Sequence, residues 1–309
     1  MRSRILNLGM IRIFGTVFAG LLGLAFGSFL NVCLTRWPED ESIVHPRSHC
    51  RHCDHTLAWR ENVPLISWLA LRGRCRNCRA WIGCRYPLVE LAVGALWAYA
   101  VWTLPHGLLN PDTPTSVRNI DAILAVGQMI LEWLLIALAA LDAEHLWLPD
   151  WITLPGGALG FLFFFLFIYL NSGRVHSFYG AESLQQRVLT HLAFQRFLGI
   201  LAAAALILLI RWLYWLIRRR EGIGLGDAKL MALLAAWLGL PGALLAFALG
   251  SILGALAALI LLAIPTARTN PQSWATSKLP LGTFLCIAGI VSSLWGQPII
   301  AAYLRWAGF

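Results

Sequence analysis

The chain has 309 residues, of which 59% are hydrophobic and 13% are charged, with a mean hydropathy of +0.69. A soluble protein carries about 25% charged residues, so the composition excludes an ordinary soluble domain and predicts a protein of the lipid bilayer. The formal net charge of +9 is almost entirely arginine, because Lys229 and Lys278 are the only lysines. The basic residues lie in loops between apolar runs. The positive-inside rule of membrane proteins therefore explains them better than binding to a nucleic acid does.

Eight apolar runs follow one another along the chain. The first, residues 11–34, is too long for the core of a signal peptide and lacks a small-x-small cleavage site, which predicts a retained span. The other runs cover residues 87–104, 119–141, 152–171, 195–217, 228–240, 242–264 and 280–302. Runs of roughly 18 or more residues can cross a bilayer. The sixth run is shorter, and Pro241-Gly242 marks a tight turn after it. We therefore expect an all-α polytopic membrane protein with about eight transmembrane helices.

The one sizeable polar segment, residues 36–86, sets the orientation. It carries arginines at positions 36, 47, 51, 60, 72, 74, 76, 79 and 85, so the positive-inside rule predicts that it is cytoplasmic and that the N-terminus is outside. The loops at residues 142–151, 218–227 and 265–279 then also face the cytoplasm. The polar segment 172–194 is external, and its sequence indicates no chemistry.

Two C-x-x-C pairs lie within this polar segment. Cys50 and Cys53 are followed after 21 residues by Cys75 and Cys78, which is the pattern of a four-thiolate structural zinc site. A reducing cytosol argues against two disulfides in this segment. The alternatives to a zinc site are a redox role for the C-x-x-C pairs and a loop that binds no metal. We expect arginines at positions 51, 72, 74, 76 and 79 to favour the thiolates, and His49, His52 and His55 are possible substitute ligands. Cys33 and Cys286, within apolar runs, are expected to be inert packing residues.

Two aspartates stand where long apolar runs meet polar stretches. An ionisable residue at the edge of a membrane span is costly and indicates function. Asp142 ends the third run, where the helix dipole disfavours a negative charge, so helix capping does not account for it. Asp227 follows Gly224-Leu225-Gly226 and opens the sixth run, where capping is an equally good interpretation. The predicted topology places both aspartates on the cytoplasmic side, where a pair of carboxylates can share a proton and activate water.

Two further acidic residues have other expected roles. Asp150 lies just before the fourth run and is expected to be its N-cap. Glu132 lies within the third run, so we expect it to face the interior of the helix bundle; a supporting role beside the aspartates is an alternative for it.

In these motifs taken together, the sequence resembles the type IV prepilin peptidases, which are membrane aspartic proteases. The resemblance extends over nearly the whole chain, and the order and spacing of its motifs make it specific. It includes Phe26-Gly27-Ser28-Phe29-Leu30-Asn31-Val32, the polar segment 36–86 with its four paired cysteines (the cysteine segment), Arg85-Tyr86-Pro87, Leu148-Pro149-Asp150, Gly224-Leu225-Gly226-Asp227 and Leu279-Pro280-Leu281-Gly282. One departure is Cys84, which stands where the family often has serine.

The resemblance implies that Asp142 and Asp227 are the catalytic pair and that the substrates are prepilins and pseudopilins of type II secretion. It also implies N-methylation of the new N-terminal residue with S-adenosylmethionine, in an enzyme of the bacterial inner membrane. The implied organisation is a first transmembrane helix (1–35), a zinc-binding, methyltransferase-associated domain (36–86) and a membrane-embedded peptidase domain (87–309). The dipole at the start of the sixth run favours an ionised Asp227, which leaves Asp142 as the expected proton carrier.

Two other classes share part of the pattern. The presenilin and signal-peptide-peptidase type has Gly-x-Gly-Asp, but it would require Pro-Ala-Leu where this chain has Pro280-Leu281-Gly282, and it gives the cysteine segment no role. A transporter or channel would use the acidic residues as ion ligands.

Overall fold

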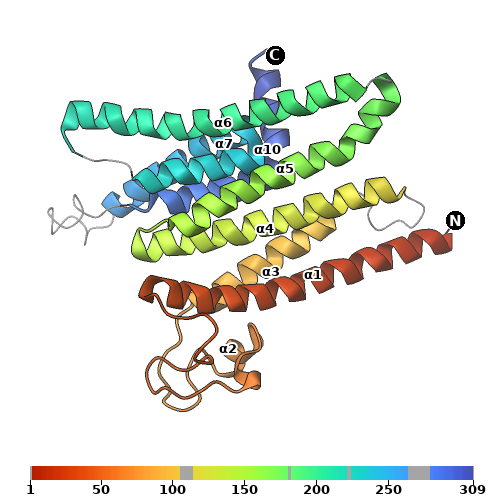
Figure 1. Cartoon of the computed structure of the whole chain (residues 1–309). Helices are drawn as coiled ribbons and strands as arrows, with labels where there is room; N and C mark the ends of the chain where they lie inside the picture. The colour runs from red at the N-terminus through yellow and green to blue at the C-terminus, as the bar shows by residue number, and fades with distance from the viewer. Residues whose placement is uncertain (1, 105–113, 180–181, 221–223, 264–278, 309) are drawn as a thin grey trace. The chain divides into compact units, whose positions relative to one another are not determined.

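The computed structural model describes residues 2–104, 114–179, 182–220, 224–263 and 279–308 (Figure 1). Its described helices are α1 (Arg2–Arg36), α2 (Ile66–Ala70), α3 (Arg85–Thr103), α4 (Thr115–His145), α5 (Asp150–Tyr179), α6 (Glu182–Arg218), α7 (Leu225–Ala263) and α10 (Leu281–Trp306). The short 3-10 helices η1 (Trp37–Glu39) and η2 (Trp59–Glu61) lie in the polar segment. The chain divides into two compact units, Met1–Ala137 and Leu138–Phe309.

The chain is a multi-pass membrane protein. Six stretches of the described helices are long and apolar enough to cross a bilayer: Gly9–Glu39, Ile120–His145, Asp150–Asn171, Gln186–Arg218, Leu225–Leu261 and Leu281–Trp306. Helix α3 occupies the second predicted apolar run. The predicted all-α polytopic architecture is confirmed, with the polar cysteine segment inserted between α1 and α3.

In the first unit, small residues allow α1 and α3 to pack with their backbones in close contact. A Cβ atom on Gly23 would come within 2.8 Å of the Gly94 Cα, and one on Gly27 within 2.7 Å of the Glu90 Cα. Such small-residue contacts are how helices associate closely in lipid. Trp97 Nε1 donates to the Met129 carbonyl of α4 at 3.0 Å. The cysteine segment, with α2, lies at the end of the unit where α1 finishes and α3 begins (Figure 1).

In the second unit, α7 is two helices that fold back on each other. Gly239 has φ 78° and ψ 170°, a left-handed conformation that interrupts the helix two residues before Pro241. The Ser292 hydroxyl of α10 donates to the Gly242 carbonyl at 2.9 Å. Further along α7, Gly254 faces Phe284, which is nearer the start of α10. The second half of α7 therefore returns toward the end from which α10 starts, as the predicted short sixth run and the turn after it require.

A partly buried arginine supports the break in α7. Arg196 of α6 directs its Nη1 toward the carbonyls of Ala235 and Trp237, at 3.3 and 3.5 Å, and its guanidinium lies 3.8 Å from the centroid of the Phe164 ring. The break deprives carbonyls at the end of a helix of their normal partners. Arg196 satisfies two of these carbonyls and places a positive charge at a helix C-terminus, where the dipole favours it.

Candidate active site and metal centre

The two C-x-x-C motifs fold into two turns with the same backbone pattern. In the first turn, the Cys50 N–H donates to the His55 carbonyl and the Asp54 N–H donates to the Cys50 carbonyl. In the second, the Cys75 N–H donates to the Ala80 carbonyl and the Arg79 N–H to the Cys75 carbonyl. Asp54 and Arg79, at equivalent positions, both have left-handed backbone conformations. Each turn is flanked by an isolated bridge, His49 with Thr56 and Arg74 with Trp81.

These turns bring the four predicted cysteine ligands together. The Sγ atoms of Cys50, Cys53, Cys75 and Cys78 all lie within 4.8 Å of one another, and those of Cys50 and Cys78 are 3.8 Å apart. Zinc–sulfur bonds of about 2.3 Å in a tetrahedron place neighbouring sulfurs about 3.8 Å apart. The donor set therefore fits a closed structural zinc site.

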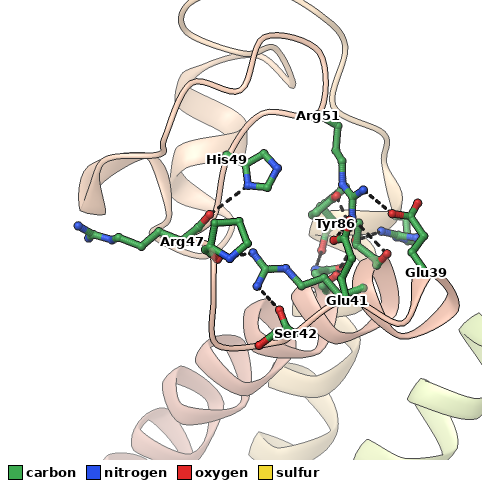
Figure 2. A network of polar contacts seen from close by, with 12 residues as sticks. Glu39, Glu41, Ser42, Arg47, His49, Arg51 and Tyr86 are labelled. Atoms are coloured by element: carbon green, nitrogen blue, oxygen red, sulfur yellow. Dashed lines mark hydrogen bonds and ion pairs between the residues drawn. The ribbon is translucent and has the colours of Figure 1, made fainter.

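Backbone and amide donors, rather than the expected arginines, stabilise thiolates in this cluster. The His55 N–H and then the Asn77 amide, whose Nδ2 lies 3.6 Å from Sγ, lower the pKa of Cys53 to about 6. Backbone N–H groups, that of Cys78 foremost, lower the pKa of Cys75. Arg51 instead binds Glu39 at 2.6 Å and Glu41 at 3.1 Å (Figure 2). The predicted role of the arginines as thiolate partners is thus wrong for Arg51, whose Nη2 also donates to the Thr35 carbonyl at 3.3 Å and so joins the cysteine segment to the end of α1.

Asp142 is held at the start of α10. Its side chain is 6% exposed. The Oδ2 atom accepts the Thr283 N–H at 2.6 Å and lies 3.0 Å from the Thr283 hydroxyl, which is also 3.1 Å from the Ala139 carbonyl. Thr283 lies in the first turn of α10, where backbone N–H groups have no partner within the helix. Sequence reasoning correctly found that Asp142 cannot cap its own helix, but the conclusion that no cap explains it was wrong, because it caps a helix that starts far along the chain.

The approach of Asp142 to α10 requires glycine at position 282. A Cβ atom there would lie 2.9 Å from both Cγ and Oδ2 of Asp142, closer than such atoms pack. The Leu279-Pro280-Leu281-Gly282 motif therefore has a local physical reason: Pro280 precedes the helix, and Gly282 admits the carboxylate to the free N–H groups.

Asp227 occupies the first turn of α7. It is 8% exposed, and its Oδ2 accepts the Gly224 N–H at 3.1 Å. Because α7 begins at Leu225, Asp227 is the third helical residue and binds back to the residue before the helix. This is a capping interaction, although from within the first turn rather than from the N-cap position.

Leu148 links the surroundings of the two aspartates. Cβ atoms built on Gly226 and on Gly282 would come within 3.1 and 3.0 Å, respectively, of the Leu148 side chain. Gly226 precedes Asp227, and Gly282 adjoins the Asp142 carboxylate. The structure thus brings the ends of α4, α7 and α10 together around Leu148, with both carboxylates buried there.

The other two predicted acidic residues have different partners. Asp150 is the first residue of α5 rather than the residue before it, and its carboxylate binds Lys229 at 2.5 Å. Glu132 is fully buried, in the first unit, and its Oε1 accepts from Gln128 Nε2 at 3.0 Å. Sequence reasoning missed Thr283, because a threonine that opens an apolar helix carries no signal until its partner is known.

Comparison with known proteins places these residues within two family models. The bacterial peptidase A24 N-terminal domain matches residues 21–104, which include the four cysteines. The type IV leader peptidase family model matches residues 129–259, which include Asp142 and Asp227. A prepilin leader peptidase/N-methyltransferase of Stutzerimonas stutzeri is 34% identical over 310 residues, covering 93% of each chain.

The chain belongs to the type IV leader peptidase family. Proteins with the same description from Pseudomonas aeruginosa and Aeromonas hydrophila are 33% and 34% identical, each covering 94% of this chain and 93% of the relative. The family confirms the predicted resemblance and the prediction of a protease. No solved structure matches the chain.

Proposed function

We propose that this chain cleaves the leader peptide from type IV prepilins and type II secretion pseudopilins, with Asp142 and Asp227 as the catalytic dyad. The observation that supports the dyad most directly is the burial of two carboxylates at helix ends that meet around Leu148. Family membership supports the reaction, since the relatives are described as prepilin leader peptidases. Buried carboxylates that share a proton can activate water without a covalent intermediate.

The contacts of the two carboxylates indicate which one is the base and which one carries the shared proton. Asp142 accepts the Thr283 N–H and lies within reach of its hydroxyl, whereas Asp227 accepts a single N–H from Gly224. Hydrogen bonds donated to a carboxylate favour its ionised form. We therefore reverse the assignment expected from sequence: Asp142 is the base and Asp227 carries the shared proton. The sequence placed a helix N-terminus only beside Asp227, whereas the structure places one beside Asp142 as well. Because the two carboxylates share a proton, they titrate as a pair.

In this assignment Asp142 takes a proton from a water molecule while the oxygen of that water attacks the scissile carbonyl carbon. Asp227 gives its proton to the carbonyl oxygen and so stabilises the tetrahedral intermediate. Collapse of the intermediate breaks the carbon–nitrogen bond, and the leaving amine receives a proton from the dyad. The helix ends around the pair exclude bulk water, which strengthens these interactions.

The substrate and the orientation of the enzyme follow from the same proposal. A prepilin whose apolar N-terminal helix lies in the bilayer and whose basic leader stays in the cytoplasm presents its scissile bond at the inner interface. We place the chain in the bacterial inner membrane, with the dyad and the cysteine segment facing the cytoplasm. We also propose the domain boundaries predicted from the sequence, which are 1–35, 36–86 and 87–309.

We further propose that the first unit methylates the new N-terminal amine, with S-adenosylmethionine as the methyl donor. The relatives are described as N-methyltransferases as well as peptidases. Zinc, held by Cys50, Cys53, Cys75 and Cys78, has a structural role: it fixes the two turns that position the rest of the segment. S-adenosylmethionine supplies an electrophilic methyl group, and the protein has to bind it and orient the amine.

The combined activity can be tested by incubating the purified protein with a prepilin, with and without S-adenosylmethionine, and measuring the mass of the mature product. We expect loss of the leader in both reactions and an added mass of about one methyl group only with the methyl donor. An uncleaved prepilin would contradict the peptidase assignment, and a cleaved but unmethylated product would contradict the second activity alone.

A further inference from the structure

The first unit contains a cavity of about 300 Å³ between the cysteine segment and the adjoining ends of α1 and α3. This volume is in the range of sites for small molecules. Its lining includes the polar and aromatic residues Asn31, Thr35, Trp68, Trp81, Tyr86 and Glu90, and three arginines, Arg36, Arg51 and Arg76. The cavity thus combines aromatic rings with hydrogen-bonding groups, and all of these residues belong to one compact unit.

Asn31 lines this cavity and has an unused acceptor. The residue is 2% exposed, and its Nδ2 donates to the Tyr86 carbonyl at 2.9 Å. That bond fixes the amide, and the buried Oδ1 has no hydrogen-bond partner within the described part of the chain. A buried polar atom without a partner is costly, so a ligand that donates a hydrogen bond there would relieve the cost.

Glu90 supplies a buried carboxylate from the facing helix. It is 7% exposed, and Oε2 accepts the Leu65 N–H at 2.8 Å, an interaction that also anchors the cysteine segment to α3. A carboxylate in such surroundings favours a cationic group as its partner. The close contact between Gly27 and the Glu90 backbone keeps α1 and α3, and therefore the two acceptors, in a fixed relation.

The other walls are held in place before any ligand binds. Trp68 Nε1 donates to the Ile82 carbonyl at 3.1 Å, and the Trp68 and Trp81 rings meet edge-to-face with centroids 6.0 Å apart. Arg36 donates to the carbonyls of Ser42 and Pro46, both at 2.6 Å. Figure 2 shows the polar network in which Arg51 joins Glu39 and Glu41 beside Tyr86. A site built from fixed groups loses little entropy on binding.

We propose that this cavity is the binding site for S-adenosylmethionine, with Asn31 and Glu90 as the acceptors for its cationic end and the tryptophans as the surface for its adenine. The donor carries an ammonium, a sulfonium and a carboxylate group as well as an aromatic base, which matches a cavity whose lining combines buried acceptors, arginines and aromatic rings. This inference rests on the proposed methyltransferase activity and deepens it by assigning residues.

The reaction that the site serves is balanced without a further reactant. The amine nitrogen of the cleaved pilin forms a bond to the methyl carbon while the carbon–sulfur bond breaks. The electron pair of that bond leaves on sulfur, which becomes a neutral thioether, and the amine proton passes to water.

The test is calorimetric titration of the zinc-loaded, full-length protein in detergent with S-adenosylmethionine. We expect Asn31→Leu and Glu90→Gln each to weaken binding by about tenfold or more, since the first removes a hydrogen bond to a charged group and the second removes the negative charge that faces the ammonium. Val32→Phe, which adds volume to the lining, should weaken binding without removing a polar group. Thr16→Val, elsewhere on α1, and Glu132→Gln, another buried glutamate of the first unit, should leave the dissociation constant within about twofold of the unmodified protein.

The zinc content and the thermal unfolding midpoint of each variant serve as the controls for folding, because the cysteine segment belongs to the same unit as the cavity. Tight binding by the unmodified protein with no change in any of the three cavity variants would overturn the inference while leaving the methyltransferase proposal intact. No binding by the unmodified, peptidase-active protein would overturn both. Weakened binding in the control variants to the same degree would also overturn the inference, because the effect would then reflect the unit as a whole.

Discussion

At the scale of single residues, the two aspartates are bound in different ways by helix termini. Asp227 caps the helix that it opens, which could be anticipated from Gly224 and the apolar run that follows. Asp142 binds the first turn of α10 through Thr283, and no local pattern could have predicted this partner. The candidate catalytic residues were therefore identifiable from sequence, whereas the division of roles between them depends on a contact between distant segments.

Thr283 should support cleavage through its hydroxyl. Thr283→Val keeps the backbone N–H but removes the hydroxyl 3.0 Å from Asp142 Oδ2, so we expect the cleavage rate to fall by about tenfold. Thr283→Ser restores the hydroxyl and should recover most of the rate. The measurement is single-turnover cleavage of a prepilin; equal activity of the valine and unmodified proteins would show that the hydroxyl has no role.

At the scale of helices and motifs, small residues set how closely functional groups approach. Gly282 admits Asp142 to the start of α10, and the left-handed Gly239 lets α7 fold back on itself. The turn in α7 was predicted from Pro241-Gly242 and lies two residues earlier, since glycine adopts the required backbone conformation more readily than other residues.

Gly282→Ala should impair catalysis more than stability. The added Cβ would meet Asp142 at 2.9 Å and displace its carboxylate, so we expect about a hundredfold loss of cleavage. Gly157→Ala provides the matched control in the same unit, because its Cβ would lie at an ordinary 3.6 Å from Leu233 Cα. Comparable rates for the two variants would contradict the proposed close contact.

Arg196 should matter for stability. Arg196→Leu removes the positive charge and the two carbonyl contacts at the break in α7, and it should destabilise the protein by about 1.5–3 kcal/mol. Thermal unfolding in detergent would measure this as a lower midpoint, with Arg305→Leu, at an exposed arginine near the end of α10, as the control. An unchanged midpoint for Arg196→Leu would mean that other groups satisfy these carbonyls.

At the scale of the whole molecule, apolar runs and charge in the loops were sufficient to predict a polytopic helical protein. The cysteine spacing likewise predicted the four-sulfur cluster, because each C-x-x-C turn is local. What the sequence could not provide is the cavity in the first unit, since it depends on how residues of α1, α3 and the cysteine segment meet. Cavities arise from packing between distant segments and leave no periodic pattern.

Metal analysis tests the structural zinc. Purified protein should contain about one zinc ion per chain, and Cys75→Ser, which removes a buried ligand, should lower the content sharply. Cys84→Ser is the control, because Cys84 is exposed and lies outside the cluster. A folded, active protein that contains no zinc would refute this site.

The central claim, that Asp142 and Asp227 form the catalytic dyad, is tested most directly by prepilin cleavage with three single variants of the purified, folded protein. Asp142→Asn and Asp227→Asn should each lower the cleavage rate by at least about a thousandfold, because neither remaining carboxyl can both activate water and protonate the carbonyl. Asp150→Asn, which breaks only the partly exposed pair with Lys229, should retain most activity. Appreciable cleavage by either dyad variant, or complete loss in Asp150→Asn, would contradict the assignment.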